Sequence, residues 1–453
     1  MNLINLLQQH EGKQLEFKRD LSSPVHVLRT IVAFANSAGG TLLIGVEDKT
    51  RAVRGVKDAM DIQERLANII STGIAPPLMP AIEVLPWRKE SVIAVEVYPS
   101  YSRPHYMVAA GPEDGTYFRV GASNRKADPG MREELRRSAR REAYDEEPMP
   151  EADSEAIDFR AASESFAPFR KLSKRDLESL HLVVDHQGRR VPSRGGMILF
   201  GNIRDRFFPD AWIQAGRFRG STKTHILDSR EFRDHPVKAV HEAAEFVQRH
   251  ASQAMRIEAM ERSEHWSIPL PAVREAIINA VVHADYSQTG SPIRVLVFDD
   301  RVEIESPGLL PFGLVVEDIL QGVSRLRNRV IGRVFKELRL IEQWGSGVGR
   351  MIESCREHGL PSPEFEEVAT HFRVTLRLQG GAEFTIDDTS RIILKILQDK
   401  GQLNTRAIAE AIGRSSRSAR TKLKALVERG LIAELGSGPT DPKRVYVLIR
   451  GGM

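Results

Sequence analysis

The sequence contains almost no cysteine and no long apolar segment. Cys355 is the only cysteine in 453 residues, which excludes an intrachain disulfide and argues against a cysteine-based zinc site. No apolar run reaches the roughly 18 residues of a membrane-spanning helix. The first residues lack a basic start followed by an apolar core and a cleavage site. We therefore expect no secretory leader, no membrane partner and a reducing, cytoplasmic setting.

The remaining composition is that of an ordinary globular chain, with 41% hydrophobic and 28% charged residues. No fixed-period repeat or low-complexity segment is present, and the length predicts about three domains. The charge is uneven, because residues 388–453 hold 13 Lys and Arg against 6 Asp and Glu, a net +7, while the rest of the chain is near −3. A small basic domain on a near-neutral body predicts a polyanionic partner for that domain.

Short apolar segments between glycine-rich and polar stretches predict mixed α/β structure. In the N-terminal part we expect a helix over 25–35 and strands over 14–18, 41–46, 91–97 and 117–120. The charge-dense stretch that follows has little to place in a core, so it is expected to form a linker. In the next unit we expect helices over 237–254, from 271 onward and over 329–338, with strands over 197–200, 211–215, 293–298, 301–305 and 372–378.

Carboxylates cluster near the N-terminus. Glu16 and Lys18 are two residues apart on an expected strand, so they share a face. Glu11 lies just before this strand, and Asp48 follows the strand over 41–46. Three converging carboxylates could hold Mg²⁺ or Mn²⁺, and Lys18 could stabilise charge developing on a phosphate. The alternative is a solvated strand face with no catalytic role.

Several blocks of this region resemble the Schlafen/AlbA-type DNA-binding domain over about residues 10–130. The matching blocks are LEFKRD, AFANSAGGTLLIGVEDKTRAVRGV, RPHY and YFRVGASNRKA. In nuclease-competent Schlafen proteins, metal-binding carboxylates occupy a Glu-x4-Glu-Phe-Lys pattern and the second acidic position of a Gly-Val-Asp-Asp turn. The resemblance places Glu11, Glu16 and Asp48 at these positions, with Glu47 replacing the first Asp. It implies DNA or RNA, including tRNA, as partner, and a dimer or higher oligomer, because Schlafen nucleases pair two such lobes.

No P-loop occurs, and the Gly216–Thr224 segment that imitates one has the wrong spacing. Glu275, Asn279 and His283 recur every four residues in an otherwise apolar segment and should share one helix face. A helix this apolar should be buried, so Asn279 needs a partner or a ligand. The alternative is a core helix whose polar residues are satisfied internally.

Two further blocks accompany this helix. Ser306-Pro307-Gly308 follows an expected strand, and a glycine cluster opens an expected helix, where backbone N–H groups could reach phosphates. The glycines are Gly345, Gly347 and Gly349. Together the blocks resemble, over about 195–380, the GHKL-type ATPase domain in the divergent version found in bacterial RecG-like regulators.

The GHKL resemblance implies ATP and Mg²⁺ as cofactors. Glu275 would be the general base, Asn279 would hold Mg²⁺, and the glycine cluster would cover the phosphates. Ser306 and Gly308 would line the adenine site, where Ser306 replaces the superfamily's aspartate and cannot accept a hydrogen bond as a carboxylate does. A helicase activity finds no support, because paired motor motifs are absent from the sequence.

The C-terminal segment predicts three helices and a β-hairpin, a winged helix-turn-helix. Thr405 is expected to cap the second helix. The basic residues expected to bind nucleic acid lie around the third helix and the wing, namely Arg414, Arg417, Arg420, Lys422, Lys443 and Arg444. The alternative is a protein-interaction wing.

These observations predict an α/β multidomain protein. The expected parts are a Schlafen/AlbA-type domain over 1–130, a helical linker over 131–168, a GHKL-like sandwich with a lead-in region over 169–380, and a winged helix over 388–453. One hypothesis is a metal-dependent endonuclease, gated by ATP and able to hydrolyse ATP weakly. The other is an ATP-responsive, DNA-binding transcriptional regulator without nuclease activity.

Overall fold

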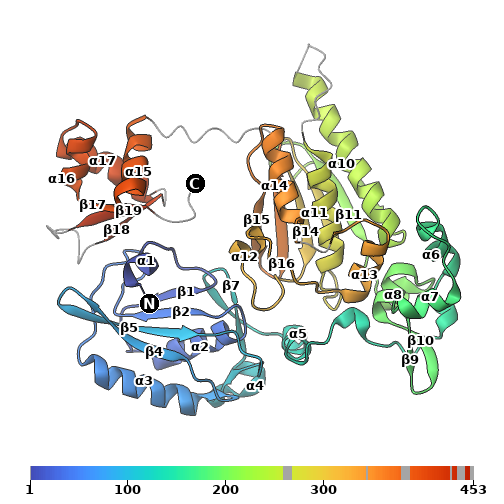
Figure 1. Ribbon diagram of the computed structural model, residues 1–453, viewed down its shortest axis with the longest axis horizontal. Coiled ribbons are helices and arrows are strands. Elements are labelled where there is room, and N and C mark those ends of the chain that lie inside the picture. The colour runs from blue at the N-terminus through green and yellow to red at the C-terminus, as the bar shows by residue number, and fades with distance from the viewer. Residues whose placement is uncertain are drawn as a thin grey trace. The chain divides into compact units, whose positions relative to one another are not determined.

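The computed structural model describes residues 2–258, 268–342, 345–378, 388–428, 431–435 and 444–448. The chain forms two compact units, one made of residues 1–136 and 382–453 and the other of residues 137–381 (Figure 1). None of the described helices is both long and apolar enough to cross a bilayer.

The N-terminal domain is built on a four-stranded sheet with strand order β1-β2-β5-β4. Its strands are β1 (Leu15–Lys18), β2 (Gly40–Ile44), β4 (Ala81–Trp87) and β5 (Glu90–Val97). β1 and β2 are parallel because α2 (Pro24–Ala35) joins them as a crossover, whereas the other pairs are antiparallel. α2 and α3 (Ala59–Gly73) cover the face that carries Leu42 and Ile44. The mixed α/β fold expected here is confirmed.

Alternation along β1 sets the directions of its side chains. Leu15 and Phe17 are buried on the face away from α2. Glu16 and Lys18 share a face, as the sequence predicted, and they pair in register with Leu42 and Ile44, so this face is the α2 side. The smaller elements of this domain are α1 (Leu3–Leu7), β3 (Ile74–Ala75), β6 (Tyr106–Met107), α4 (Gly111–Asp114), β7 (Tyr117–Val120), β8 (Ser123–Lys126) and α5 (Pro129–Arg140).

The second unit is built on a six-stranded sheet with strand order β12-β11-β13-β14-β16-β15. Its strands are β11 (Ile213–Phe218), β12 (Ile226–Phe232), β13 (Ile293–Val297), β14 (Arg301–Pro307), β15 (Glu364–Val368) and β16 (His371–Arg377). Three helices, α10 (Pro236–Glu258), α11 (Leu270–His283) and α14 (Gly347–Glu357), pack on one face of this sheet (Figure 1). The sheet and the helices enclose the main hydrophobic core.

Part of the expected linker over 131–168 belongs to this core instead. Phe166 is fully buried, and Asp145 accepts hydrogen bonds at the N-terminus of α13 (Arg329–Glu337), from the Val330 amide at 2.7 Å among others. Because the stretch is rich in charged residues, the sequence did not reveal that some of its positions are buried. The other elements here are α6 (Phe159–Phe166), α7 (Lys174–Ser179), β9 (Val183–His186), β10 (Arg189–Pro192), α8 (Arg194–Phe200), α9 (Arg204–Phe207) and α12 (Val316–Leu320).

The strand expected over 197–200 is wrong, because these residues end the helix α8. Ser193 caps the helix by accepting from the Gly196 amide at 2.9 Å. All residues from Gly195 to Phe200 are buried, so the segment is apolar throughout. A short continuous apolar run does not distinguish a buried strand from a buried helix.

The C-terminal segment forms the winged helix-turn-helix expected from the sequence. Its elements are α15 (Asp388–Lys400), β17 (Gln402–Leu403), α16 (Thr405–Ala411), α17 (Ser416–Glu428), β18 (Ile432–Leu435) and β19 (Val445–Leu448). The cap of α16 is Asn404 rather than Thr405, since the Asn404 side chain accepts from the Ala407 amide at 2.9 Å. The turn of the expected hairpin, over 436–442, and the expected DNA-binding residue Lys443 lie outside the described residues.

Candidate nucleotide pocket and nucleic-acid interfaces

α11 presents one polar stripe, and its remaining faces are buried in the core. Apolar side chains such as Ile277 and Val281 have almost no exposed surface. Glu275, Asn279 and His283 all line a single pocket, so the common face predicted from their four-residue spacing is confirmed.

The pocket lies between α11, α14, the strands β14, β15 and β16, and the chain around α12. Much of its lining is apolar and includes Ile304, Leu310, Val348, Met351, Phe365 and Phe372. Within the part of the chain that the structure describes, Glu275 and Glu342 are the only carboxylates among the lining residues. The pocket is therefore largely apolar, with polar groups placed at particular points, as in small-molecule sites.

The N-terminus of α14 lies directly against Glu275 and Asn279. A Cβ atom added to Gly347, the first residue of α14, would lie 2.1 Å from Glu275 Oε1 and 3.5 Å from Asn279 Nδ2. Gly345 precedes it with a φ of +67°, and a Cβ there would lie 2.1 Å from the Gly322 carbonyl oxygen. Position 345 therefore requires glycine, whereas a Cβ atom at position 347 would displace the end of the Glu275 side chain. The unpaired amides of a helix N-terminus favour anions. Gly349, predicted together with these glycines, has open space around it and does not line the pocket.

Glu275 is engaged in an ion pair that the sequence did not reveal. Asn279 Nδ2 donates to Glu275 Oε1 at 3.2 Å, and Arg350 donates to Glu275 Oε2 at 2.9 Å. Arg350 also pairs with Glu342 at 2.6 Å. The signal for Arg350 was its position directly after the glycine cluster, but its partner is 75 residues away along the chain.

The other end of the pocket is held by the turn that follows β14. Gly308 has a φ of +104°, and a Cβ there would lie 2.9 Å from the Cβ of Asp285. The Asp285 amide donates to the Pro307 carbonyl at 2.7 Å, which fixes this turn to the end of α11. Ser306 and Gly308 therefore line the pocket together with His283, as expected for the first two from the sequence.

His283 is neutral near physiological pH. Burial, together with the charge of Arg327, lowers the pKa of His283 to about 4. No hydrogen-bond partner of its Nδ1 atom is found within the described part of the chain, although the atom is buried. The helix spacing pointed to His283, but which partners its Nδ1 atom has among the described residues depends on the surrounding fold.

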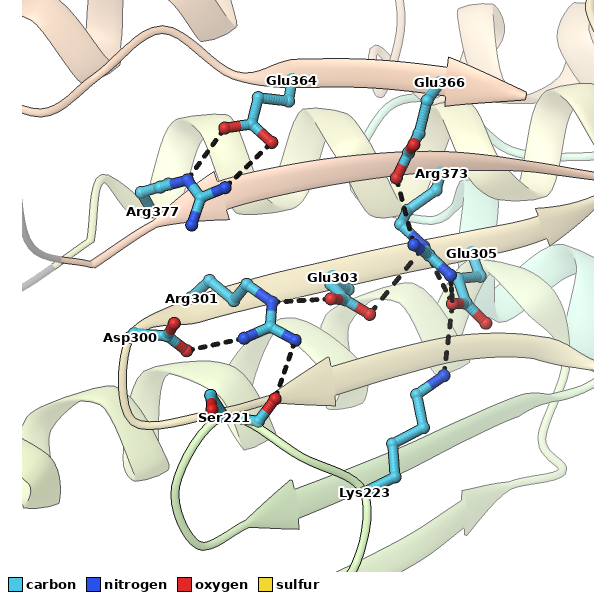
Figure 2. Close-up of polar contacts among 10 residues, drawn as sticks. All are labelled: Ser221, Lys223, Asp300, Arg301, Glu303, Glu305, Glu364, Glu366, Arg373 and Arg377. Atoms are coloured by element: carbon cyan, nitrogen blue, oxygen red, sulfur yellow. Dashed lines mark hydrogen bonds and ion pairs between the residues drawn. The ribbon is translucent and has the colours of Figure 1, made fainter. Parts of the chain in front are cut away.

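The face of the sheet opposite the pocket is covered by a network of ion pairs (Figure 2). Arg373 contacts Glu305 at 2.8 Å, and Lys223 contacts it at 3.3 Å. Although burial opposes the effect, the charges of Lys223 and Arg373 hold the pKa of Glu305 below its ordinary value. Because residues alternate along β14, this network fixes the strand from one side while Ser306 faces the pocket on the other.

In the N-terminal domain, Glu16 is bound by two cations. Arg119, which is fully buried, donates to Glu16 Oε2 at 2.6 Å and to the Gly12 carbonyl at 2.8 Å. Lys18 contacts the other oxygen of Glu16. Arg119 belongs to the YFRVG block of the sequence, but nothing in that block indicated its partner.

Glu11 and Asp48 lie together beside this pair. Glu11 accepts from the Phe17 amide at 2.6 Å, and its side chain is hydrogen-bonded to Asp48. Burial, with contributions from the neighbouring Glu16 and Asp48, raises the pKa of Glu11 to about 7. A proton shared by two close carboxyl groups relieves their repulsion.

Glu11, Glu16 and Asp48 do not form the predicted metal-binding site in this arrangement. Among the described residues, no group of three or more His, Cys, Asp or Glu side chains could hold a metal ion. Glu11 and Asp48 meet, but both oxygens of Glu16 are occupied by Lys18 and Arg119. The three carboxylates therefore do not fit a shared cation unless Glu16 leaves its partners.

The winged helix presents arginines at the start of α17. Arg414, Arg417 and Arg420 are exposed and form no ion pair within the described part of the chain. Lys422 is partly buried and has an interaction of its own. Arg444 is paired with Glu434 at 2.8 Å, so it is less available to a ligand than expected. The first turns of the second helix of a helix-turn-helix are where such domains contact DNA.

Comparison with family models assigns three parts of the chain. Residues 11–128 match "Schlafen, AlbA_2", residues 290–376 match "Putative ATP-dependent DNA helicase recG C-terminal", and residues 386–433 match "Winged helix-turn-helix DNA-binding". The second match begins after α11, so Glu275 and Asn279 lie outside it.

Solved structures give further similarities. A crystal structure of the DIP2311 protein from Corynebacterium diphtheriae is 21% identical, covers 96% of this chain and 92% of that chain, and has a TM-score of 0.40. The solution structure of the N-terminal domain of a "Putative ATP-dependent DNA Helicase RecG-related Protein" from Nitrosomonas europaea is 25% identical, covers 28% of this chain and 95% of that chain, and has a TM-score of 0.23. No curated protein matches this chain. The chain is therefore similar, in order, to a Schlafen AlbA_2 domain, to a recG C-terminal domain of the ATPase type and to a winged helix-turn-helix DNA-binding domain.

Proposed function

We propose that this protein is an ATP-responsive DNA-binding regulator, in which nucleotide bound at the α11–α14 pocket controls DNA binding by the winged helix. The observation that carries the nucleotide site is the close approach of Gly347 to Glu275 and Asn279, because it brings the N-terminus of α14 and two polar side chains together in one pocket. This is where the phosphates of ATP would lie.

Asn279 is suited to hold Mg²⁺ at this site. Its Nδ2 donates to Glu275, and no donor to its Oδ1 is found among the described residues. An amide oxygen is a hard ligand of the kind that Mg²⁺ takes, and the ion would neutralise phosphate charge when bound. Glu275 accepts from Arg350, so it could act as a base only after that ion pair opens. We therefore infer that the present arrangement binds nucleotide rather than hydrolyses it.

Calorimetric titration of MgATP tests the site. Asn279→Ala should weaken binding at least tenfold, because it removes the amide oxygen. Arg274→Ala is the matched control, since Arg274 is exposed on the same helix and does not line the pocket. Unchanged affinity in Asn279→Ala would place the nucleotide elsewhere.

Fluorescence anisotropy with a labelled duplex tests the coupling between nucleotide and DNA. We expect MgATP to change the Kd for DNA in the wild-type protein and to have no effect in Asn279→Ala. If the Kd of the wild-type protein is the same with and without MgATP, the regulatory part of the proposal fails.

A metal-dependent nuclease is the second candidate, favoured by the contact between Glu11 and Asp48. The test is cleavage of DNA and tRNA in the presence of Mn²⁺. Asp48→Ala should abolish cleavage, whereas Asp61→Ala, which removes an exposed acid of α3, should not. Absence of cleavage by the wild-type protein, or cleavage that survives Asp48→Ala, would remove this candidate.

We also propose a homodimer or higher oligomer, because the chain matches the Schlafen model once and that resemblance implies paired lobes. Light scattering coupled to size-exclusion chromatography measures the mass, and a monomer at micromolar concentration would contradict the proposal.

A further inference from the structure

The two polar ends of the pocket are separated by the length of α11. Glu275 lies at the end that faces Gly347, and His283 lies eight residues later at the end formed by Ser306 and Gly308. Eight residues of α-helix rise about 12 Å, a distance that a nucleoside triphosphate can span. If the phosphates lie at the N-terminus of α14, the base lies at the His283 end.

The lining between the two ends suits a planar base. Phe365 and Phe372, from adjacent strands, and Ile304 contribute apolar surface there. Apolar and aromatic side chains bury the faces of such a ring, while a few polar groups meet its edge.

The polar side chains that line the base end carry no negative charge. Both lining carboxylates described above, Glu275 and Glu342, are tied to Arg350 at the phosphate end. Asp285 lies behind the turn, and its oxygens accept from Ser287 and Gln288, so it is engaged there rather than lining the pocket. Ser324 and Arg325 also line the pocket, and Arg325 donates to the Phe312 carbonyl. Ser306 and the neutral His283 are the polar side chains beside the turn after β14 that can meet the edge of a base.

We propose that Ser306 and His283 read the base edge and accept adenine and guanine alike, so that the pocket binds purine nucleoside triphosphates without strong preference between ATP and GTP. This inference rests on the proposed nucleotide site and widens its ligand class from ATP to purine nucleoside triphosphates.

The chemical reason is that both side chains can reverse their hydrogen bonds. A hydroxyl donates or accepts, and a neutral imidazole does either at each nitrogen, depending on its tautomer. Because Nδ1 of His283 has no hydrogen-bond partner among the described residues, these residues do not fix the tautomer from that side. A carboxylate side chain at position 306 could only accept hydrogen bonds, so it would favour the amino group of adenine and repel the carbonyl oxygen of guanine. Strong discrimination requires that the wrong ligand leave a buried group unpaired, and neither purine does so here.

The experiment compares ATP, GTP and inorganic tripolyphosphate by calorimetry on the full-length protein in Mg²⁺. We expect the Kd values for ATP and GTP to agree within about tenfold and tripolyphosphate to bind at least tenfold more weakly. An ATP preference above about a hundredfold, or equally tight binding of tripolyphosphate, would overturn the inference while leaving the phosphate site intact. If the wild-type protein binds none of the three, the proposed function fails as well.

A variant pair isolates the role of Ser306. Ser306→Asp should increase the preference for ATP over GTP at least tenfold, whereas Ser229→Asp, at an exposed position on β12 of the same sheet, should leave the ratio unchanged. An unchanged ratio in folded Ser306→Asp refutes the role of Ser306. If that variant does not fold, Ser306→Ala replaces it: it should weaken ATP and GTP by similar factors and leave tripolyphosphate unaffected, and unchanged purine binding would refute the inference.

Discussion

The replacement Gly347→Ala separates nucleotide binding from folding. The added methyl group would lie 2.1 Å from Glu275 Oε1, whereas carbon and oxygen normally stay more than about 3 Å apart, so the carboxylate must retreat by about 1 Å or more. Its contacts with Asn279 and Arg350 would break. Because the displaced atom is the end of a flexible side chain and alanine favours a helix by up to about 1 kcal/mol, the free energy of unfolding should change by no more than about 1 kcal/mol.

Gly347→Ala should change the affinity for MgATP much more than it changes the free energy of unfolding. The methyl group narrows the N-terminus of α14 where the phosphates would lie, so we expect MgATP affinity to fall about 10- to 100-fold, which corresponds to about 1.4–2.8 kcal/mol. Calorimetry and thermal melting measure the two quantities on the same samples. Gly349→Ala is the control, because it lies two residues later in α14 with nothing within 4 Å of the added atom. Wild-type affinity in Gly347→Ala, or an equal loss in Gly349→Ala, would refute the reasoning.

Three further predictions concern the N-terminal domain and the winged helix. Glu16→Ala leaves the buried Arg119 without its charge partner and should lower the free energy of unfolding by about 3–5 kcal/mol in denaturant titrations; a change below about 1 kcal/mol would contradict this. The Glu11 pKa, raised from 4.5 to about 7, means that the folded protein holds a proton there that the unfolded chain loses, so its contribution to stability declines as pH rises from about 4.5 to 7. In melting curves, Glu11→Gln should lack the decline in stability that the Glu11 proton causes between about pH 4.5 and 7. An identical pH dependence in the wild-type protein and in Glu11→Gln would argue against this role. Arg417→Ala and Arg420→Ala should each weaken duplex binding and make the log–log salt slope, expected near −4 to −5, less steep by about one unit; slopes that do not change would exclude these arginines from the phosphate contacts.

Local patterns in the sequence were sufficient where a feature repeats with the period of one element. The four-residue spacing of Glu275, Asn279 and His283 predicted their common face, because residues four apart are neighbours on any α-helix. The alternation along β1 placed Glu16 and Lys18 on one side for the same kind of reason. The third helix of the winged helix followed from the spacing of its apolar residues, and its basic character from its arginines and lysines.

Local patterns failed where burial depends on distant segments. The stretch over 131–168 is rich in charge, yet Phe166 is fully buried and Asp145 caps α13, which begins more than 180 residues later. The apolar run over 197–200 fits a buried strand or a buried helix equally well, and only its packed surroundings selected the helix.

The chemical state of the candidate sites was decided by the tertiary structure. The sequence supplied Glu275 and Glu16, but their partners Arg350 and Arg119 are 75 and 103 residues away, and only the fold brings these charges together. Likewise, Gly347 and Gly349 are equivalent in sequence, but only Gly347 faces Glu275 and Asn279. The sequence by itself determined the residue types and their periodicity, because both are local. Which charges are paired and which glycine borders the pocket depend on contacts between distant segments, so the tertiary structure alone decided them.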